Sequence, residues 1–225
     1  MDLKYKCLIL DHDDTAVDST ALIHHAAHLE IMKKFRPEMK PLDIEGWHLM
    51  HFRTGIKHYL KNVLNFNERE MEEEFKIWQK HAAGSAPSFY PGFLDALVRY
   101  RELGGLITVV SHSESHIVKM HYMQCFSDYN ILPDLIFGWD IDEEKRKPSP
   151  WPVYEILDHF KLKKTDVLIV DDSKHGVLMS QASDVAIAAA GWCHQIPVIK
   201  DYMKANCIRY FSDVKSFEDF ILQPK

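Results

Sequence analysis

The sequence predicts an α/β fold: a doubly wound parallel sheet with a small helical domain inserted after its first strand. From residue 87 onwards, short apolar runs alternate with segments of helical periodicity, which implies a parallel sheet with helices on both faces. Between residues 17 and 86, helical patterns follow one another with no strand pattern between them. We therefore predict a core formed by residues 1–16 and 87–225 and a helical insert formed by residues 17–86.

The first predicted strand, Cys7 to Leu10, is a short apolar run that ends abruptly in Asp11, Asp13 and Asp14. Like charges at a strand end repel one another and lose hydration, so folding alone does not favour them. A solvated turn is the simpler interpretation of such a group, because aspartate is common in turns. Segments further along the chain decide whether these carboxylates form a solvated turn or a functional site.

The insert contains three predicted helices. The first runs from Asp18 or Ser19 to about Phe35, and the second follows the apolar stripe from Ile56 to Leu64. Asn67 with Glu70 resembles a capping box that opens the third helix, which ends at Gly84.

The remainder of the core alternates between helix and strand. Ser149 and Pro150 are a typical helix start, with serine as the cap and proline at the first helical position. The other predicted helices cover residues 93–103, 114–124, a segment from about 174 and a segment around 217–221; the predicted strands cover residues 106–110, 135–137, 167–170, 185–189 and 207–211.

Composition excludes several classes of protein. The 27 basic and 33 acidic residues give a formal charge of −6 without a basic block, so we expect no nucleic-acid partner. No apolar stretch approaches the roughly 20 residues that span a bilayer, and the first residues lack the apolar core of a secretion signal. The four cysteines are scattered and are expected to be reduced. We expect a cytoplasmic monomer with no membrane contact.

Three predicted strands end in polar side chains: Asp11 and Asp13, Ser111, and Asp171 with Asp172. Parallel sheets bind ligands beyond the carboxyl ends of their strands, so these side chains are expected to converge. Four carboxylates in one crevice need a counter-ion. Their hard oxygens suit Mg²⁺ better than zinc, which prefers nitrogen and sulfur ligands that this crevice largely lacks.

Four sequence elements follow one another along the chain: Asp11-x-Asp13-x-Thr15 after a strand, Ser111 at a strand end, Lys147 in Lys-Pro-Ser-Pro, and Asp171-Asp172-Ser173 after another strand. They resemble the four ordered motifs of the haloacid dehalogenase superfamily, and the resemblance covers nearly the whole chain. The helical insert is similar to the cap domain of the C1 branch of that superfamily, and the core to its Rossmann-like core.

The resemblance implies a catalytic role for four side chains. Asp11 is the expected nucleophile that forms an aspartyl-phosphate, and Asp13 the expected general acid and then general base. Ser111 is expected to donate a hydrogen bond to a phosphoryl oxygen. Lys147, rather than its neighbours Lys145 and Arg146, is expected to place a positive charge near that oxygen and near Asp11.

The resemblance also implies a Mg²⁺ cofactor. Its expected ligands are the Asp11 carboxylate, the Asp13 main-chain carbonyl and Asp172, with Asp171 as a further ligand or as a partner of the ligands. Thr15 is expected to support the turn after the first strand.

These roles predict a Mg²⁺-dependent phosphatase that acts on a small phosphorylated metabolite. A phosphosugar mutase similar to β-phosphoglucomutase uses the same residues with water excluded, and is the alternative. A haloacid dehalogenase is disfavoured because that subgroup does without the carboxylate of Asp13. A non-catalytic binding protein with this fold is expected to lose Asp11, Lys147 or Asp172, and all three are present.

Several residues depart from the motifs or lie near them. Asp14 stands where glycine is usual, His12 where an aromatic residue is common and Ala16 where leucine is common; we expect Asp14 to be a surface residue. His112 is a candidate for contact with the phosphate or the substrate, although a lone histidine is more often satisfied by other contacts or solvated. Arg53 and Lys57 are candidates for contact with an anionic substrate, although a charged helix face is the simpler explanation. A metal pair among His24, His25 and His28 lacks a third ligand and is not favoured.

Overall fold

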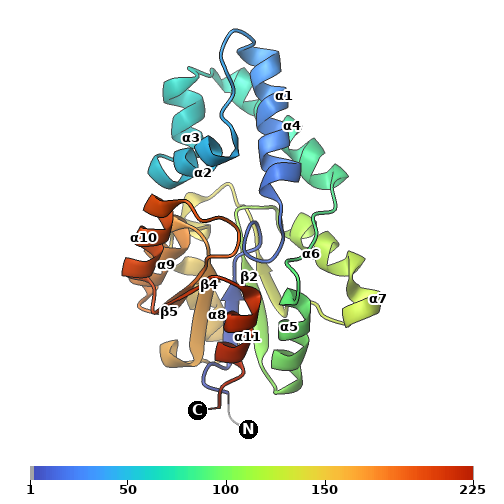
Figure 1. The fold of residues 1–225 in the computed structure, drawn as a ribbon, viewed down its shortest axis with the longest axis vertical. Coiled ribbons are helices and arrows are strands. Elements are labelled where there is room, and N and C mark those ends of the chain that lie inside the picture. The colour runs from blue at the N-terminus through green and yellow to red at the C-terminus, as the bar shows by residue number, and fades with distance from the viewer. Residues whose placement is uncertain (1–2, 225) are drawn as a thin grey trace. The chain divides into compact units, whose positions relative to one another are not determined.

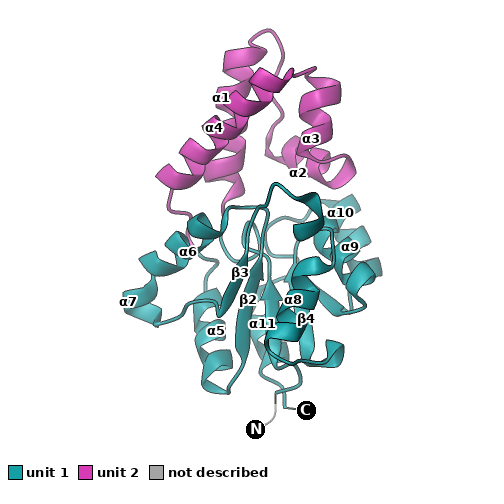
Figure 2. Cartoon of the chain, turned by 180° about the vertical axis from the view of Figure 1, so that it is seen from behind, with its two compact units in different colours: residues 1–17, 89–225 teal, residues 18–88 magenta. Residues whose placement is uncertain are grey.

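The computed structural model describes residues 3–224, which belong to two compact units (Figures 1 and 2). One unit contains the chain up to residue 17 and from residue 89 onwards, and the other contains residues 18–88. The sequence placed these junctions at 16/17 and 86/87, within one or two residues of the structural division.

The larger unit is built on a six-stranded parallel sheet with the order β3-β2-β1-β4-β5-β6. Every residue of the two central strands β1 and β4 is buried, as expected for a parallel sheet covered on both faces. The predicted α/β fold is thereby confirmed. The strands are β1 (Cys7–Leu10), β2 (Leu106–Val110), β3 (Leu135–Phe137), β4 (Val167–Asp171), β5 (Ala186–Ala190) and β6 (Arg209–Phe211).

Helices cover both faces of this sheet (Figures 1 and 2). On one face, Phe93, Tyr100 and Phe217 of α5 and α11 are fully buried in the same cluster as Leu8 and Leu10 of β1. The helices of this unit are α5 (Phe93–Glu102), α6 (Ser115–Gln124), α7 (Phe126–Tyr129), α8 (Trp151–His159), α9 (Lys174–Ser183), α10 (Pro197–Asn206) and α11 (Val214–Ile221), with 3₁₀ turns η3 (Glu143–Lys145) and η4 (Lys164–Asp166).

Element boundaries differ from the prediction in a few places. Helix α8 begins at Trp151, so that Pro150 is the cap residue, while the Ser149 hydroxyl still accepts a hydrogen bond from the Trp151 amide at 3.2 Å. Strand β5 begins at Ala186 rather than Val185. Helix α10 was not predicted, because its buried side chains, Ile199 and Met203, span a single helical turn.

The smaller unit is entirely helical. Its core contains buried side chains from α1, α2, η2 and α4, among them Met32, Trp47, Leu60 and Ile77. Helix α2 was not predicted. The elements are η1 (Thr20–His24) and η2 (Tyr59–Val63), both π-helical, and α1 (His25–Phe35), α2 (Ile44–Arg53), α3 (Ile56–His58) and α4 (Glu68–Gly84).

The capping box predicted for the third helix of the insert is confirmed at the start of α4. The Asn67 side chain accepts a hydrogen bond from the Glu70 amide, and the Glu70 carboxylate accepts one from the Asn67 amide, both at 3.0 Å. Two main-chain amides at the helix start are thus satisfied.

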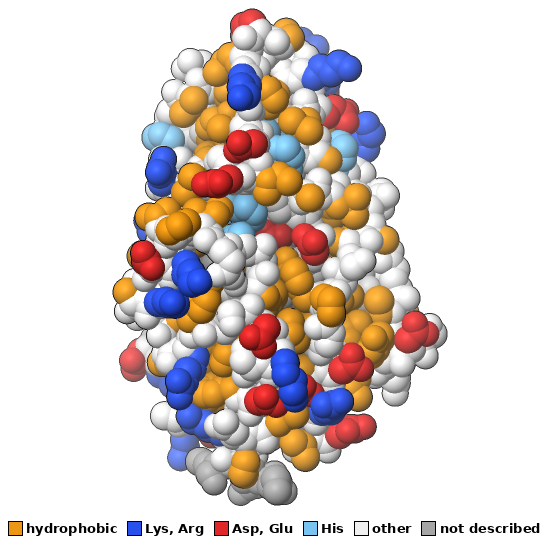
Figure 3. Space-filling view, in the orientation of Figure 1, with side chains coloured by type: hydrophobic (Ala, Val, Ile, Leu, Met, Phe, Trp, Pro, Cys, Tyr) orange, Lys and Arg blue, Asp and Glu red, His pale blue; other side chains and the backbone are white. Residues whose placement is uncertain are grey.

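Charge is mixed on the surface. Figure 3 shows basic and acidic side chains interspersed over one face of the molecule.

Within residues 3–224, none of the helices has both the length and the apolar character needed to cross a membrane.

We expect His28 to make the stability of the protein depend on pH. Its Nε2 accepts a hydrogen bond from the Leu42 amide at 3.0 Å, and burial, aided by the charge of His25, lowers its pKa from 6.5 to about 4. Between these values the unfolded chain binds a proton that the folded chain does not, so the free energy of unfolding falls as pH falls from 6.5 to 4.

Urea denaturation at pH 7, 5.5 and 4.5 tests this expectation. In His28→Gln the fall should be smaller than in the wild-type protein, whereas His159→Gln, which changes an exposed histidine, should keep the wild-type dependence. Equal dependence in all three proteins would contradict the role of His28.

Candidate active site

The strand register brings the predicted site residues to one edge of the sheet. Leu10 of β1 pairs with Val109 of β2 on one side and with Val170 of β4 on the other. Asp11, which follows β1, donates its amide proton to the Val170 carbonyl oxygen at 2.9 Å. The carboxyl ends of three neighbouring strands therefore meet at this edge, as parallel sheets require.

Three carboxylates gather there. Oxygens of Asp11, Asp171 and Asp172 lie within 4.8 Å of one another. The Lys147 ammonium reaches the same point, with Nζ at 2.7 Å from Asp11 Oδ1 and 2.9 Å from Asp171 Oδ2. Lys147 is only 3% exposed, so this ion pair is shielded from water.

The side chains of Lys145 and Arg146 contact other carboxylates. Lys145 lies 3.9 Å from a carboxylate oxygen of Asp142, and Arg146 lies 3.0 Å from one of Glu143. Only Lys147 of the three reaches the carboxylates, as the sequence predicted.

His112 fixes the main chain at Lys147. Its Nε2 donates a hydrogen bond to the Lys147 carbonyl oxygen at 2.9 Å. Burial, followed by the positive charge of Lys147, lowers the pKa of His112 to about 3, so its ring is neutral at ordinary pH. His112 is therefore satisfied by a main-chain hydrogen bond, in agreement with the simpler expectation for a lone histidine.

The carboxylates lack sufficient positive charge. Burial raises the pKa of Asp11 to about 7; the charge of Asp171 adds to this rise and Lys147 opposes it. Burial, with the charges of Asp11 and Asp171, also raises the pKa of Asp172 well above its ordinary value. One ammonium thus faces three carboxylates, and a further cation would stabilise them.

The donor set fits Mg²⁺. All three side chains offer hard carboxylate oxygens, which Mg²⁺ prefers and which Asp11 and Asp172 can share with water and phosphate oxygens. Asp171 is largely occupied, because its Oδ2 contacts Lys147 and its Oδ1 accepts hydrogen bonds from the Ser173 amide and hydroxyl at 2.8 and 2.7 Å.

Asp13 differs from the predicted group of four converging carboxylates. Its Oδ2 accepts a hydrogen bond from the Ser113 hydroxyl at 2.6 Å and a longer one from the Ser111 hydroxyl at 3.4 Å. Its carboxylate therefore lies outside the group of three, turned toward two serines. Ser113 is a site residue that the sequence analysis missed, since nothing in the local pattern distinguishes it from other loop serines.

Thr15 joins the loop after β1 to the loop after β4. Its hydroxyl donates to Asp172 Oδ1 at 3.0 Å and accepts from the Asp172 amide at 3.1 Å. The Trp192 indole N–H in turn donates to the Thr15 carbonyl oxygen at 3.0 Å. These contacts give Thr15 the supporting position that was expected of it.

Comparison with known proteins gives the family. The profile of the haloacid dehalogenase-like hydrolases matches residues 8–190, which are most of the chain and include Asp11, Lys147, Asp171 and Asp172. The chain belongs to the haloacid dehalogenase-like hydrolase family. The resemblance found in the sequence is confirmed.

Individual relatives of this hydrolase are distant. A phosphoglycolate phosphatase of Haemophilus influenzae is 22% identical over 132 residues, which are 58% of each chain. The chain therefore spans less than two thirds of the length of that relative. The protein named "Putative pyrophosphatase PpaX" of Caldanaerobacter subterraneus subsp. tengcongensis is 24% identical over 208 residues, 84% of this chain and 83% of its own.

Solved structures share the fold of this hydrolase. CbbY from Rhodobacter sphaeroides, in complex with phosphate, superimposes with a TM-score of 0.68 at 16% identity and covers 93% of this chain and 94% of its own. A protein titled "Putative beta-phosphoglucomutase" from Bacteroides vulgatus gives 0.74 at 18% identity, covering 99% and 92%. At such identities the likeness concerns the fold.

The expectation that Asp14 of the hydrolase is a surface residue is wrong. Asp14 is only 8% exposed, and its backbone has φ of +58°. This left-handed conformation explains why glycine is usual at this position of the motif, and aspartate is among the few other residues that adopt it readily. The charge of Asp14 contributes to the raised pKa of Asp172.

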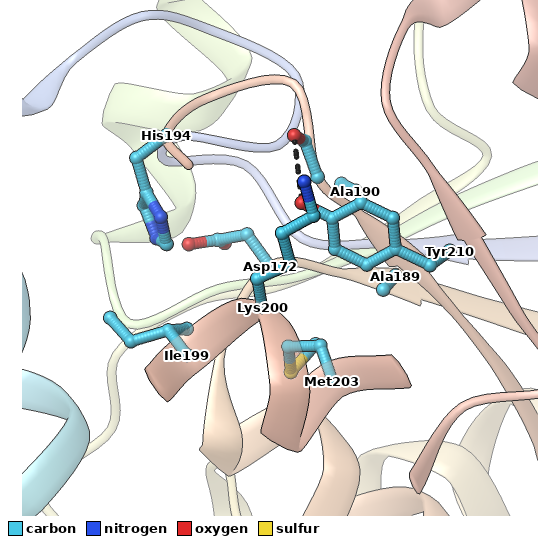
Figure 4. A pocket seen from close by; sticks show the side chains of 9 residues that line it. Asp172, Ala189, Ala190, His194, Ile199, Lys200, Met203 and Tyr210 are labelled. Atoms are coloured by element: carbon cyan, nitrogen blue, oxygen red, sulfur yellow. Dashed lines mark hydrogen bonds between the residues drawn. The ribbon is translucent and has the colours of Figure 1, made fainter. Parts of the chain in front are cut away.

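Two ligand-type side chains beside Asp172 were also missed. Cys193 and His194, in the loop after β5, place a sulfur and a ring nitrogen within 4.8 Å of an Asp172 oxygen and of each other. Figure 4 shows the His194 ring and the Asp172 carboxylate directed toward one another in a small pocket. The expectation that the crevice largely lacks nitrogen and sulfur ligands is therefore wrong, and no local sequence pattern signalled this contact.

The candidates in residues 18–88 have simpler explanations. His25 Nε2 lies 2.8 Å from the Leu42 carbonyl oxygen, and His28 accepts from the Leu42 amide, so both imidazoles bind main chain. The Trp78 indole N–H donates to His24 at 3.1 Å. Arg53 and Lys57 are exposed on this unit.

We expect Gly176→Ala to disrupt the carboxylate group. A Cβ at residue 176 would lie 2.2 Å from Asp171 Cγ, so Asp171 would have to leave its positions beside Lys147 and Ser173. The free energy of unfolding should fall by about 1–3 kcal/mol, the usual cost of overpacking a buried site. Urea denaturation measures it.

Gly84→Ala is the matched control, because nothing lies within 4 Å of a Cβ placed there. It should leave stability unchanged or slightly raised. A Gly176→Ala protein as stable as this control would show that Asp171 is not held as tightly as described.

Proposed function

We propose that this hydrolase is a phosphatase that cleaves a small phosphorylated metabolite through an aspartyl-phosphate on Asp11. The observation that carries the proposal is the position of the Asp11 carboxylate: Asp11 directly follows the central strand β1, and its Oδ1 contacts Lys147 at 2.7 Å. An ammonium so placed neutralises the repulsion between the carboxylate and an incoming phosphate. The match to relatives named as phosphatases supports the same reaction class.

In the first step, an Asp11 oxygen attacks phosphorus and the bond from phosphorus to the leaving oxygen breaks. Asp13, in its protonated form, gives its proton to that leaving oxygen. In the second step, Asp13 takes a proton from water as the water attacks phosphorus, and the bond to Asp11 breaks to release phosphate. Ser113 and Ser111 hold the Asp13 carboxyl in the resting protein through their hydroxyls.

Asp11 and Asp172 are the side chains we propose as Mg²⁺ ligands, together with the main-chain carbonyl of Asp13. Asp171 is proposed as the partner that orients Lys147, since both its oxygens are already engaged. Bound Mg²⁺ would supply positive charge that stabilises the carboxylates and the phosphoryl oxygens. Thr15 would orient Asp172 through the hydrogen bonds described above.

The mutase reaction on a phosphosugar, which isomerises a sugar phosphate, is the competing reaction. It uses the same side chains, and the fold is shared with a protein titled as a β-phosphoglucomutase. The two reactions differ in the acceptor of the phosphoryl group. A panel of phosphorylated metabolites with Mg²⁺, analysed for inorganic phosphate and for isomerised sugar phosphate, distinguishes them. Phosphate release without isomer supports the phosphatase, and isomer without phosphate release supports the mutase.

Asp11→Asn should abolish turnover, because the amide is not a nucleophile. Asp13→Asn should lower kcat by roughly 10²–10⁴-fold, the usual contribution of general acid–base catalysis. Phosphate release on the best substrate of the panel measures both effects.

Asp158→Asn is the control, since the side chain of Asp158 is 84% exposed and only pairs with Lys161 on the surface. It should retain full activity. Hydrolysis by Asp11→Asn at the rate of this control would exclude Asp11 as the nucleophile.

Removal of divalent cations should stop turnover. With the carboxylates left to one ammonium, phosphate approach is disfavoured by charge, so dialysis against a chelator should reduce phosphate release to background and added Mg²⁺ should restore it. Activity that persists after exhaustive chelation would contradict the proposed cofactor.

A further inference from the structure

Asp172 takes part in a second donor set that the proposed reaction does not use. The set consists of Asp172 at the end of β4 and of Cys193 and His194 in the loop after β5, all three partly accessible to solvent. The Cys193 sulfur lies 4.0 Å from Asp172 Oδ2. One thiol sulfur, one imidazole nitrogen and one carboxylate oxygen thus lie within 4.8 Å of one another.

We propose that Asp172, Cys193 and His194 bind a zinc-class cation such as Zn²⁺ or Co²⁺. Sulfur and imidazole nitrogen are the ligands that such cations prefer, whereas Mg²⁺ prefers oxygen. A three-residue set also leaves a fourth tetrahedral position for water.

The spacing suits this coordination. Zinc bonds of about 2.3 Å to sulfur and 2.0 Å to oxygen, at a tetrahedral angle, place the two ligand atoms about 3.5 Å apart. The observed 4.0 Å requires a shift of about half an ångström, within the reach of a side-chain rotation in the half-buried loop.

The electrostatics of the pocket also favour a cation. The Cys193 sulfur faces Asp172, whose oxygens also lie within 4.8 Å of oxygens of Asp11 and Asp171, so negative charge is concentrated beside the set. A bound cation would displace the thiol proton to solvent and offset this charge. Lys200 also lines the pocket, but its ammonium is bound to Gln195 Oε1 at 2.7 Å.

The site has a consequence that rests on the proposed function. Asp172 belongs both to this set and to the carboxylate group proposed for Mg²⁺. A cation held by Cys193 and His194 withdraws an Asp172 oxygen from Mg²⁺. Zinc should therefore inhibit Mg²⁺-dependent phosphate release.

Cobalt titration of the chelator-treated full chain tests the site without any need for turnover. One equivalent of Co²⁺ should bind and produce the near-ultraviolet absorption of a cobalt–thiolate bond. Cys193→Ser should abolish this absorption, and His194→Gln should weaken Co²⁺ binding by about 10-fold or more. Cys125→Ser, which alters a partly exposed thiol outside the donor set, should behave as wild type.

A second measurement needs no variant. Zn²⁺ should slow alkylation of Cys193, but not of Cys125, when both are mapped by mass spectrometry in the wild-type protein. Absence of the cobalt band, a band that survives Cys193→Ser, Co²⁺ affinity unchanged in His194→Gln, or alkylation of Cys193 unaffected by zinc would each overturn the proposal.

Inhibition is measured separately, relative to the zinc-free rate of each protein. Cys193→Ser should raise the zinc concentration needed for half-inhibition by about 10-fold or more, and Cys125→Ser should not. If the chain releases no phosphate at all, the proposed function fails while the cobalt titration still decides the site. If Co²⁺ binds but zinc does not slow phosphate release, the proposed competition between this site and Mg²⁺ for Asp172 is wrong.

Discussion

The ion pair of Lys147 with Asp11 and Asp171 is the interaction on which the rest of the site depends. The parallel register of β1 and β4 forces the two carboxylates together, and each follows or ends a fully buried strand. Without the ammonium, two negative charges would face each other away from water. Loss of one partner of a buried pair typically costs about 3–5 kcal/mol, because the remaining charge is left uncompensated. A lysine from a distant loop therefore offsets part of the repulsion between carboxylates at this edge of the sheet.

That lysine is held by groups that cannot take part in the proposed phosphoryl transfer themselves. His112, neutral at ordinary pH, binds the main chain at Lys147, and Ser173 occupies the second oxygen of Asp171. Gly176 has no Cβ, and this leaves space for the Asp171 side chain. These contacts explain how a flexible lysine side chain is confined to one position, and they leave Asp11 as the carboxylate of the pair that an incoming group can reach.

Residues that the sequence predicted well are those placed by the backbone alone. Once the apolar runs were read as parallel strands, the positions after them had to converge, which located Asp11, Ser111 and Asp171. Asn67 and Glu70 were predictable for a similar reason, since a capping box is a local pattern of four residues. Features set by side-chain rotation or by distant loops were not predictable. Asp13 turns to Ser113, Asp14 is buried in a left-handed turn, and Cys193 meets Asp172 across 21 positions of sequence.

The choice between hard and soft cations at Asp172 is governed by one short loop. Trp192 donates to the Thr15 carbonyl oxygen, and Thr15 holds Asp172 Oδ1, so the segment that carries Trp192 also stabilises the proposed Mg²⁺ ligand. The next residue, Cys193, faces the other oxygen, Oδ2. One oxygen of the Asp172 carboxylate thus accepts a hydrogen bond from Thr15, and the other faces a thiol. Because affinity follows ligand softness, a cation that accepts sulfur would be drawn toward Oδ2, and one that accepts only oxygen toward Asp11.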